Sequence, residues 1–359
     1  MSTGPVETRP EDGERPSWWI YRGDGLPPAP GTVVALPDPP PWRTFRATVV
    51  QPPSAAPDED SERKLGRPNP AWPRRAGRRE CDMVNAAIRL RRPLLVTGPP
   101  GAGKSALAYR VARELGLGRV LKWPVTSHTT LRSGLYEYDA IGRAQAAATV
   151  RAVHAAAAPA DNGDGAAEPG VGDFVRLGPV GTALLPYERP RVLLIDELDK
   201  SDIDLPNDLL HIFEDGEFTI PELVRVRQHA SEVPVYTDDP GLVAVIRDGR
   251  LRCRAFPIVV ITSNGEREFP PAFLRRCLPL EIPPPDAGDL ASMIRAQLPR
   301  LHEDPRGLIQ DFMTRAERNP LARDQLLNAL YLIMSGAYGE DLEAQQGLID
   351  SVLHSLSAE

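Results

Sequence analysis

Eight consecutive residues, GPPGAGKS at positions 98–105, have the types and the spacing of a loop that binds the phosphates of a nucleotide. Its glycines allow backbone N–H groups to turn toward the phosphates, and the helix predicted to follow directs its N-terminus at the same negative charge. In the pattern G-x-x-x-x-G-K-[ST], Lys104 would reach the β and γ phosphates and the Ser105 hydroxyl would ligate Mg²⁺. The sequence therefore predicts a site for ATP and Mg²⁺. The residues expected to contact the nucleotide are Gly98, Pro99, Pro100, Gly101, Ala102, Gly103, Lys104, Ser105 and Ala106.

An acidic pair, Asp196-Glu197, follows a second apolar stretch at 192–195. The pair would lie at the carboxyl end of a strand, where open α/β sheets bind their ligands. We expect Asp196 to hold Mg²⁺ through water and Glu197 to polarise the water that attacks the γ-phosphate. An acidic pair at the end of a strand is common by itself, but beside a phosphate-binding loop it indicates nucleotide hydrolysis.

A third group of candidate residues lies in the segment 256–280. Its apolar stretch ends at Ser263-Asn264, and the amide of Asn264 can orient the lytic water if it lies beside the acidic pair. Arg275 and Arg276 follow, and either could stabilise the transferred charge in its own subunit or in a neighbour. The chain has 38 arginines and only four lysines, so ordinary surface charge is the alternative interpretation of these two arginines.

These motifs require a parallel sheet to position them. Apolar stretches predict strands at 94–97, 120–125, 192–195, 256–262 and 278–282, with helical spacing between them. From Asp286 onward the pattern is helical only. Strands that alternate with helices, followed by helices alone, indicate an α/β fold: a parallel five-stranded sheet with flanking helices and then a small all-α lid domain.

Residues 1–75 differ from the rest in composition, because they contain 16 of the 39 prolines. By proline content the segment is extended or disordered. It also contains four of the five tryptophans, which gain nothing from remaining in water. We therefore predict an extended Pro-rich N-terminal arm that docks through SWWIY at 17–21 and PWRTF at 41–45. A freely moving tail is the alternative.

Composition also excludes several classes of protein. The net charge of −7 argues against a protein that holds nucleic acid mainly by charge, and a local basic groove is the alternative. Three scattered cysteines form no C-x-x-C pair, which excludes a disulfide framework or a zinc module and suggests a reducing cytosol. The N-terminus is acidic and proline-rich rather than apolar, and no run approaches 18 apolar residues. We expect a soluble cytoplasmic protein with no membrane segment.

The three motifs, in this order, resemble those of AAA+ ATPases, which have the P-loop NTPase fold. Three further stretches resemble the MoxR-like group: TSHTTLRSGLYEYD at 126–139, GDFVRLGPVGTALLPYERPRVLLIDELDK at 172–200 and LLHIFEDGEFTI at 209–220. The resemblance covers about residues 76–340. It implies that Asn264 is the sensor-1 residue and Arg276 the arginine finger, with Arg275 as second choice. The implied sensor-2 arginine, which would contact the nucleotide from the lid, is Arg323, with Arg315 and Arg318 as competitors.

The resemblance also implies a domain organisation. The arm would occupy 1–75 and the α/β nucleotide-binding domain 76–284, with an insert at about 140–190 and a hairpin insert at about 222–255. The α-helical lid would occupy 285–359.

The function implied is a Mg²⁺-dependent, chaperone-like ATPase that acts as a homo-oligomeric ring, a hexamer, and remodels or switches a partner protein. MoxR-like proteins often work beside von Willebrand A-domain partners, which makes such a protein a candidate partner. The alternative is a scaffold or signalling module that ATP gates with little turnover. A nucleic-acid motor is disfavoured by the negative net charge.

Overall fold

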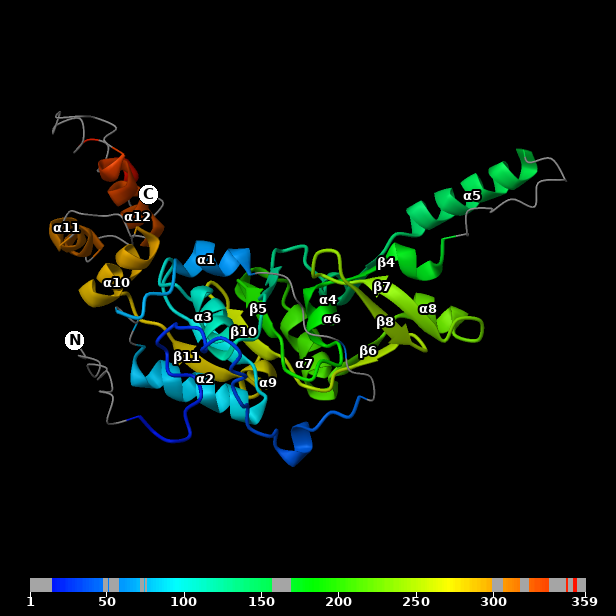
Figure 1. Cartoon of the computed structure of the whole chain (residues 1–359), viewed down its shortest axis with the longest axis horizontal. Helices are drawn as coiled ribbons and strands as arrows, with labels where there is room; N and C mark the ends of the chain where they lie inside the picture. The colour runs from blue at the N-terminus through cyan, green and yellow to red at the C-terminus, as the bar shows by residue number, and fades with distance from the viewer. Residues whose placement is uncertain are drawn as a thin grey trace.

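The computed structural model describes residues 15–47, 51, 58–71, 74, 76–156, 169–298, 306–316, 323–335, 347 and 351–353. Three regions lie beside one another in Figure 1: a helical C-terminal region, a central α/β sheet, and a second sheet from which one long helix projects. The predicted motifs belong to the central sheet and its connections.

The central sheet has five parallel strands in the order β11-β1-β10-β5-β2. Its strands are β1 (Leu94–Thr97), β2 (Leu121–Pro124), β5 (Val192–Asp196), β10 (Ile258–Thr262) and β11 (Leu278–Glu281). A parallel sheet covered on both faces has nearly continuous apolar strands. In β5, Leu193 and Ile195 enter one apolar core while Val192 and Leu194 enter the other. This arrangement confirms the predicted fold class.

Helices cover both faces of the central sheet. The helices α2 (Arg78–Leu90) and α3 (Ala106–Leu115) contribute to one core, and α6 (Pro179–Ala183) and α7 (Leu205–Asp215) contribute to the other. The helix α3 ends at Gly116, whose φ of 60° is in the left-handed region that favours glycine. The shorter helices are α4 (Leu131–Leu135), α8 (Pro221–Val226), α9 (Pro271–Leu274) and the 3₁₀ turns η1 (Pro41–Arg43), η2 (Val171–Phe174) and η3 (Leu198–Lys200).

The second sheet is built from the connections of the central sheet and has the order β3-β4-β7-β8-β9-β6. Its strands are β3 (Tyr136–Tyr138), β4 (Val175–Leu177), β6 (Glu217–Thr219), β7 (Glu232–Tyr236), β8 (Val243–Arg247) and β9 (Arg250–Arg252). The strands β7 and β8 form an antiparallel pair over residues 232–247. The helix α5 (Ala140–Ala156) projects from this sheet (Figure 1). The pattern of the sequence did not predict a six-stranded sheet here.

The C-terminal region is helical and has an apolar core of its own. It contains α10 (Ala287–Gln297), α11 (Arg306–Ala316) and α12 (Arg323–Met334). Leu290, Phe312 and Leu326, one from each helix, are buried together in this core. This region corresponds to the predicted lid. In the described part of the chain, no helix has both the length and the apolar character that crossing a membrane would need.

The N-terminal arm docks on α2 through SWWIY. Trp19 and Tyr21 are buried, and the Trp19 indole donates a 2.9 Å hydrogen bond to Asp82. Asn85, which is 1% exposed, accepts hydrogen bonds from the backbone N–H groups of Ile20 and Tyr21. Its amide donates to the Tyr21 carbonyl at 2.7 Å. A single buried side chain therefore satisfies three backbone groups of the arm.

A second anchor of the arm is the carboxylate of Glu114 on α3. It accepts hydrogen bonds from the backbone N–H groups of Arg22, Gly23 and Gly25. Burial raises the pKa of Glu114 to about 7, with a smaller contribution from Asp24. The arm thus supplies the donors that a carboxyl group in this buried position needs.

The second predicted docking segment, PWRTF, lies against the central domain through two of its residues. The ring of Phe45 stacks on Phe256 with centroids 5.6 Å apart, and the Arg43 guanidinium lies 4.6 Å from the Phe256 ring centroid. Trp42 is 78% exposed, so the prediction that this tryptophan anchors the arm is wrong. Trp72 lies outside the described residues.

One part of the predicted extended arm is a helix, α1 (Glu59–Leu65). The Asp58 side chain accepts a hydrogen bond from the Ser61 N–H and caps the helix, and Gly66 ends it. Acidic residues occupy its first turn and Arg63 and Lys64 its last, which suits the helix dipole. The prediction of a wholly extended arm is therefore wrong at 59–65, because local capping and charge outweigh the proline-rich surroundings.

We expect Asn85→Ala to lower the free energy of unfolding by about 3 kcal/mol, because it leaves buried backbone groups of Ile20 and Tyr21 without partners. Urea unfolding of the full chain measures this loss. The control is Arg89→Ala on the same helix, which removes an exposed contact with Trp18. Equal losses for the two variants would contradict this account of arm docking.

Candidate functional site

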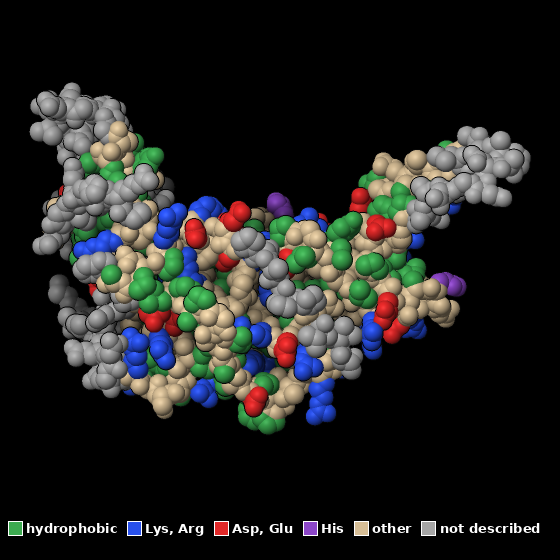
Figure 2. Space-filling view, in the orientation of Figure 1, with side chains coloured by type: hydrophobic (Ala, Val, Ile, Leu, Met, Phe, Trp, Pro, Cys, Tyr) green, Lys and Arg blue, Asp and Glu red, His purple; other side chains and the backbone are tan. Residues whose placement is uncertain are grey.

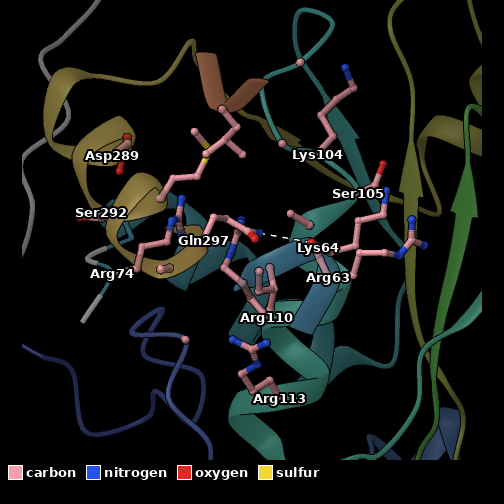
Figure 3. Close-up of a pocket in the computed structure, with 18 of the residues that line it drawn as sticks. Arg63, Lys64, Arg74, Lys104, Ser105, Arg110, Arg113, Asp289, Ser292 and Gln297 are labelled. Atoms are coloured by element: carbon pink, nitrogen blue, oxygen red, sulfur yellow. Dashed lines mark hydrogen bonds between the residues drawn. The ribbon is translucent and has the colours of Figure 1, made fainter. Parts of the chain in front are cut away.

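A cavity of about 610 Å³ opens at the carboxyl edge of the central sheet. Its walls come from the loop 98–105, from the ends of β5 and β10, from the arm and from α10 of the lid. Figure 3 shows Lys104 and Ser105 on one side of the cavity, and Ser292 and Gln297 of the lid on the other. The predicted phosphate-binding loop therefore faces a partly open cavity between the sheet domain and the lid.

The loop itself has the backbone that its glycines predict. Gly98, Gly101 and Gly103 all have positive φ, at 144°, 72° and 83°. A Cβ at Gly98 would lie 2.3 Å from the carbonyl oxygen of Ile282, so this position also requires glycine for close packing. The glycine-rich loop therefore packs directly against the backbone that follows strand β11.

Lys104 lies at the centre of this loop. Its Nζ donates to the carbonyl oxygens of Gly98 and Pro99, at 2.8 and 2.9 Å, and to Oδ1 of Asn264 at 2.7 Å. Burial lowers the pKa of Lys104, and the negative charges of Asp199 and the acidic pair oppose that shift. The lysine of the loop and the predicted sensor-1 amide are therefore in direct contact.

The carboxylate of Asp196 joins the loop to the neighbouring strands. Its Oδ1 accepts hydrogen bonds from the hydroxyls of Ser105 at 2.6 Å and Thr262 at 2.8 Å, while its Oδ2 lies 3.0 Å from Nζ of Lys122. Burial alone would raise the pKa of Asp196, but the bonds from Ser105, Lys122 and Thr262 lower it below its usual value. The carboxylate is held ionised.

Ser105 and Asp196 supply the oxygen donors that Mg²⁺ prefers. They fit this ion because a hydroxyl and an ionised carboxylate already converge within hydrogen-bond distance. Within the described residues, no group of three or more His, Cys, Asp or Glu side chains could hold a metal. This donor set suits a metal that also takes ligands from phosphates, as in a phosphate-binding loop.

Glu197 has the left-handed backbone, with φ of 63°, and its N–H donates to Oγ1 of Thr262 at 2.8 Å. Its side chain is 44% exposed and pairs with Lys200, at 2.8 Å from Nζ to Oε2. A non-glycine residue with positive φ is uncommon. Here the Thr262 hydroxyl stabilises this backbone conformation, because it contacts both the N–H of Glu197 and the carboxylate of Asp196.

Three residues of this site were not identified from the sequence: Lys122, Asp199 and Thr262. Oδ2 of Asp199 accepts the backbone N–H groups of Asn264 at 2.9 Å and Glu266 at 3.1 Å, which ties the Asn264 loop to η3. Asp199 is 3% exposed, and its Oδ1 has no hydrogen-bond partner in the described part of the chain. For Asp199, the signal in the sequence was its position in IDELDK, where Leu198 alone separates it from the acidic pair.

The two arginines after α9 do not line this cavity. Arg276 pairs through Nε with Glu214 at the end of α7, and its Nη1 donates to the Ala272 carbonyl at 3.2 Å. Arg275 is exposed. The structure therefore brings together the loop, the acidic pair and Asn264, and leaves Arg275 and Arg276 on another surface of the same chain.

The lid arginines have different positions. Arg323 is the first residue of α12, and its side chain lies outside what the structure describes. Leu327, one turn further on, lines the cavity. Arg315 pairs with Asp311 at 3.0 Å, and Arg318 lies outside the described residues.

Comparisons with known proteins address the domain that holds the loop and the acidic pair. The family model described as "AAA domain (dynein-related subfamily)" matches residues 93–277, more than half of the chain. No curated protein matches. Among solved structures, the chain is similar to the FIGL-1 AAA domain in complex with ADP, with 13% identity, a TM-score of 0.34, and coverage of 75% of this chain and 74% of that one.

We expect Asp199→Ala to reduce nucleotide turnover by about 100-fold, because the loop that carries Asn264 loses its tether and a displacement of about 1 Å at a reacting centre has an effect of this size. ATP affinity should change little, so the loss should appear in kcat and not in KM. Asp199→Asn retains one acceptor oxygen and should recover part of the rate. Turnover of Asp199→Ala at the wild-type rate would show that the tether is dispensable.

Proposed function

The chain belongs to the AAA domain family of the dynein-related subfamily, and from this premise we propose that it is a MoxR-like AAA+ ATPase that hydrolyses ATP with Mg²⁺. We further propose that it works as a hexameric ring and remodels or switches a partner protein. The observation that carries the proposal is the convergence of Lys104, Asp196 and Asn264 on one cavity.

Each residue of the cavity would have a separate role in hydrolysis. The Lys104 ammonium would leave the carbonyl oxygens of Gly98 and Pro99 for the β and γ phosphates. Ser105 and Asp196 would hold Mg²⁺, which neutralises charge on the phosphates when bound. Glu197 would polarise the attacking water, and Asn264 would orient it against the γ-phosphate.

The position of Arg276 supports action between subunits. In the single chain Arg276 pairs with Glu214, away from its own cavity. The side chains are 37% and 52% exposed, and an exposed pair contributes little stability, so Arg276 can exchange this partner for the phosphates of a neighbour. On this basis we propose a ring in which each Arg276 completes the nucleotide site of the next subunit.

A partner protein is favoured over nucleic acid as the substrate of remodelling. Basic and acidic side chains are interspersed over the face seen in Figure 2, without a continuous basic groove there. The net charge of −7 also argues against a protein that holds nucleic acid mainly by charge. We propose a protein client or a von Willebrand A-domain partner. We also propose that the protein works in the cytoplasm, because its three cysteines are all free and buried.

One observation favours the alternative, an ATP-gated scaffold with little turnover. Both members of the acidic pair have a lysine counter-ion within 3.0 Å, Lys122 for Asp196 and Lys200 for Glu197. A Glu197 carboxylate that keeps its Oε2 hydrogen-bonded to Lys200 would have one oxygen fewer to offer the attacking water. Single-turnover and steady-state hydrolysis rates of the wild-type protein distinguish the two functions.

We expect Lys104→Ala to weaken ATP binding by about 100-fold, because a charge-assisted contact with the phosphates is worth about 3 kcal/mol. Titration calorimetry measures this loss.

Glu197→Gln should bind ATP as tightly as the wild type and hydrolyse it about 100-fold more slowly, which is the contribution typical of a general base. Full turnover by Glu197→Gln would mean that another group activates the water.

We expect Arg276→Ala to bind ATP normally and to lose about 1,000-fold in turnover, the contribution of an arginine finger. A mixture of Arg276→Ala with Lys104→Ala should recover part of the activity, since the second variant supplies Arg276 to intact sites of the first. Arg275→Ala tests the second choice: loss of turnover in Arg275→Ala with Arg276→Ala still active would assign the finger to Arg275. A mixture as inactive as either parent would contradict action between subunits.

A further inference from the structure

The helix α1 of the arm lies between the phosphate-loop helix α3 and the lid helix α10. It contacts both, and it precedes the segment 93–277 that the family model matches. Figure 1 shows α1 above α3, on the side of the molecule where the lid begins. If the lid moves, α10 must move relative to α3, and α1 contacts both of these helices.

The contact between α1 and α3 depends on Arg113. Its Nη2 donates to the carbonyl oxygens of Ser61 at 2.9 Å and Gly66 at 3.0 Å, and its Nε donates to the Ser61 hydroxyl at 3.2 Å. Ser61 is buried, at 6% exposure. One guanidinium on α3 thus holds both the first turn of α1 and the residue that ends it.

The α1 segment and the lid are joined by one backbone donor and one side-chain donor. The N–H of Arg67 donates to the carbonyl of Ala296 at 3.2 Å, and the Gln297 amide donates to the carbonyl of Arg63 at 3.2 Å (Figure 3). Gly66 has φ of 72°, and a Cβ there would lie 2.4 Å from the Ala296 oxygen. The turn and the lid are therefore closer than any other residue at position 66 would allow.

The same segment borders the nucleotide cavity. Arg63, Leu65 and Asn69 line it together with Lys104 and Ser105. The end of the arm also returns to its beginning: the N–H of Ala76 donates a 3.1 Å hydrogen bond to the carbonyl of Gly23, beside the SWWIY anchor. A displacement of α1 is therefore resisted at both ends of the arm.

We propose that α1 and the Gly66–Arg67 turn clasp the lid to the phosphate-loop helix and form the outer wall of the nucleotide site, so that the arm sets how tightly nucleotide is held. This inference rests on the proposed ATPase function. This proposal gives the arm a role that its composition did not reveal. The contacts of α1 and the Gly66–Arg67 turn would keep the lid closed, and the closed lid would retain the bound nucleotide.

The test is Gly66→Ala in the full chain, with ADP and Mg²⁺ as the probe in titration calorimetry. The added Cβ must displace either the turn or Ala296, which lowers the fraction of molecules with a closed lid. We expect the Kd for ADP to rise about tenfold, equivalent to about 1.4 kcal/mol. The matched control is Gly31→Ala, since Gly31 also lies in the arm with φ of 78° but has nothing within 4 Å of a built Cβ. Its Kd should equal that of the wild type.

Hydrogen exchange separates loss of the clasp from loss of folding. In Gly66→Ala, residues 59–67 and 287–297 should exchange faster, while SWWIY and α2 remain as protected as in the wild type. Arg113→Lys, which keeps the charge but loses the planar fork, should show the same two faster segments. Wild-type ADP affinity in Gly66→Ala, or slow exchange at both segments, would overturn the proposal. A wild-type protein that binds neither ATP nor ADP would instead contradict the proposed function.

Discussion

The carboxylate of Asp196 is the interaction on which the architecture of the site depends. It receives the hydroxyl of Ser105 at the start of α3, the hydroxyl of Thr262 at the end of β10 and the ammonium of Lys122 on β2. Three parallel strands and the phosphate-loop helix therefore meet at one partly buried acidic group. Because the strands are parallel, their carboxyl ends lie at one edge, and an ionised carboxylate at that edge must be surrounded by donors to remain there.

The arm extends this arrangement beyond the segment that the family model matches. Its first anchor satisfies backbone groups through Asn85, and its second places backbone N–H groups around Glu114 on α3. A third contact stacks Phe45 on Phe256, which lies just before β10. The arm thus touches the helix that follows the phosphate loop, a core residue before a strand that ends at the site, and the lid. Proline limits the conformational freedom of such a chain before it docks, which reduces the entropy lost on docking.

The sequence predicts the central sheet well, because its strands are continuous apolar runs and because glycine, lysine and the acidic pair occur at short, fixed spacings. It does not predict the second sheet, whose strands β3, β4, β6 and β9 have three residues each and pair across long separations. Lys122, Asp199 and Thr262 were missed for a related reason. Their partners are set by strand register and by the end of η3, and neither can be read from local spacing. The helix α1 was missed because proline content outweighed its capping residues in the interpretation.

The four lysines of this arginine-rich chain converge on the site. Lys64 and Lys104 line the cavity, Lys122 pairs with Asp196, and Lys200 pairs with Glu197. An ammonium is a compact charge with three donors, whereas a guanidinium is a wide planar fork that binds a carboxylate through two parallel bonds. A fork on Asp196 would compete with Ser105 and Thr262 for Oδ1, while the ammonium of Lys122 occupies Oδ2 alone. Geometry at the carboxylate therefore gives a physical reason for lysine here in a chain that otherwise uses arginine.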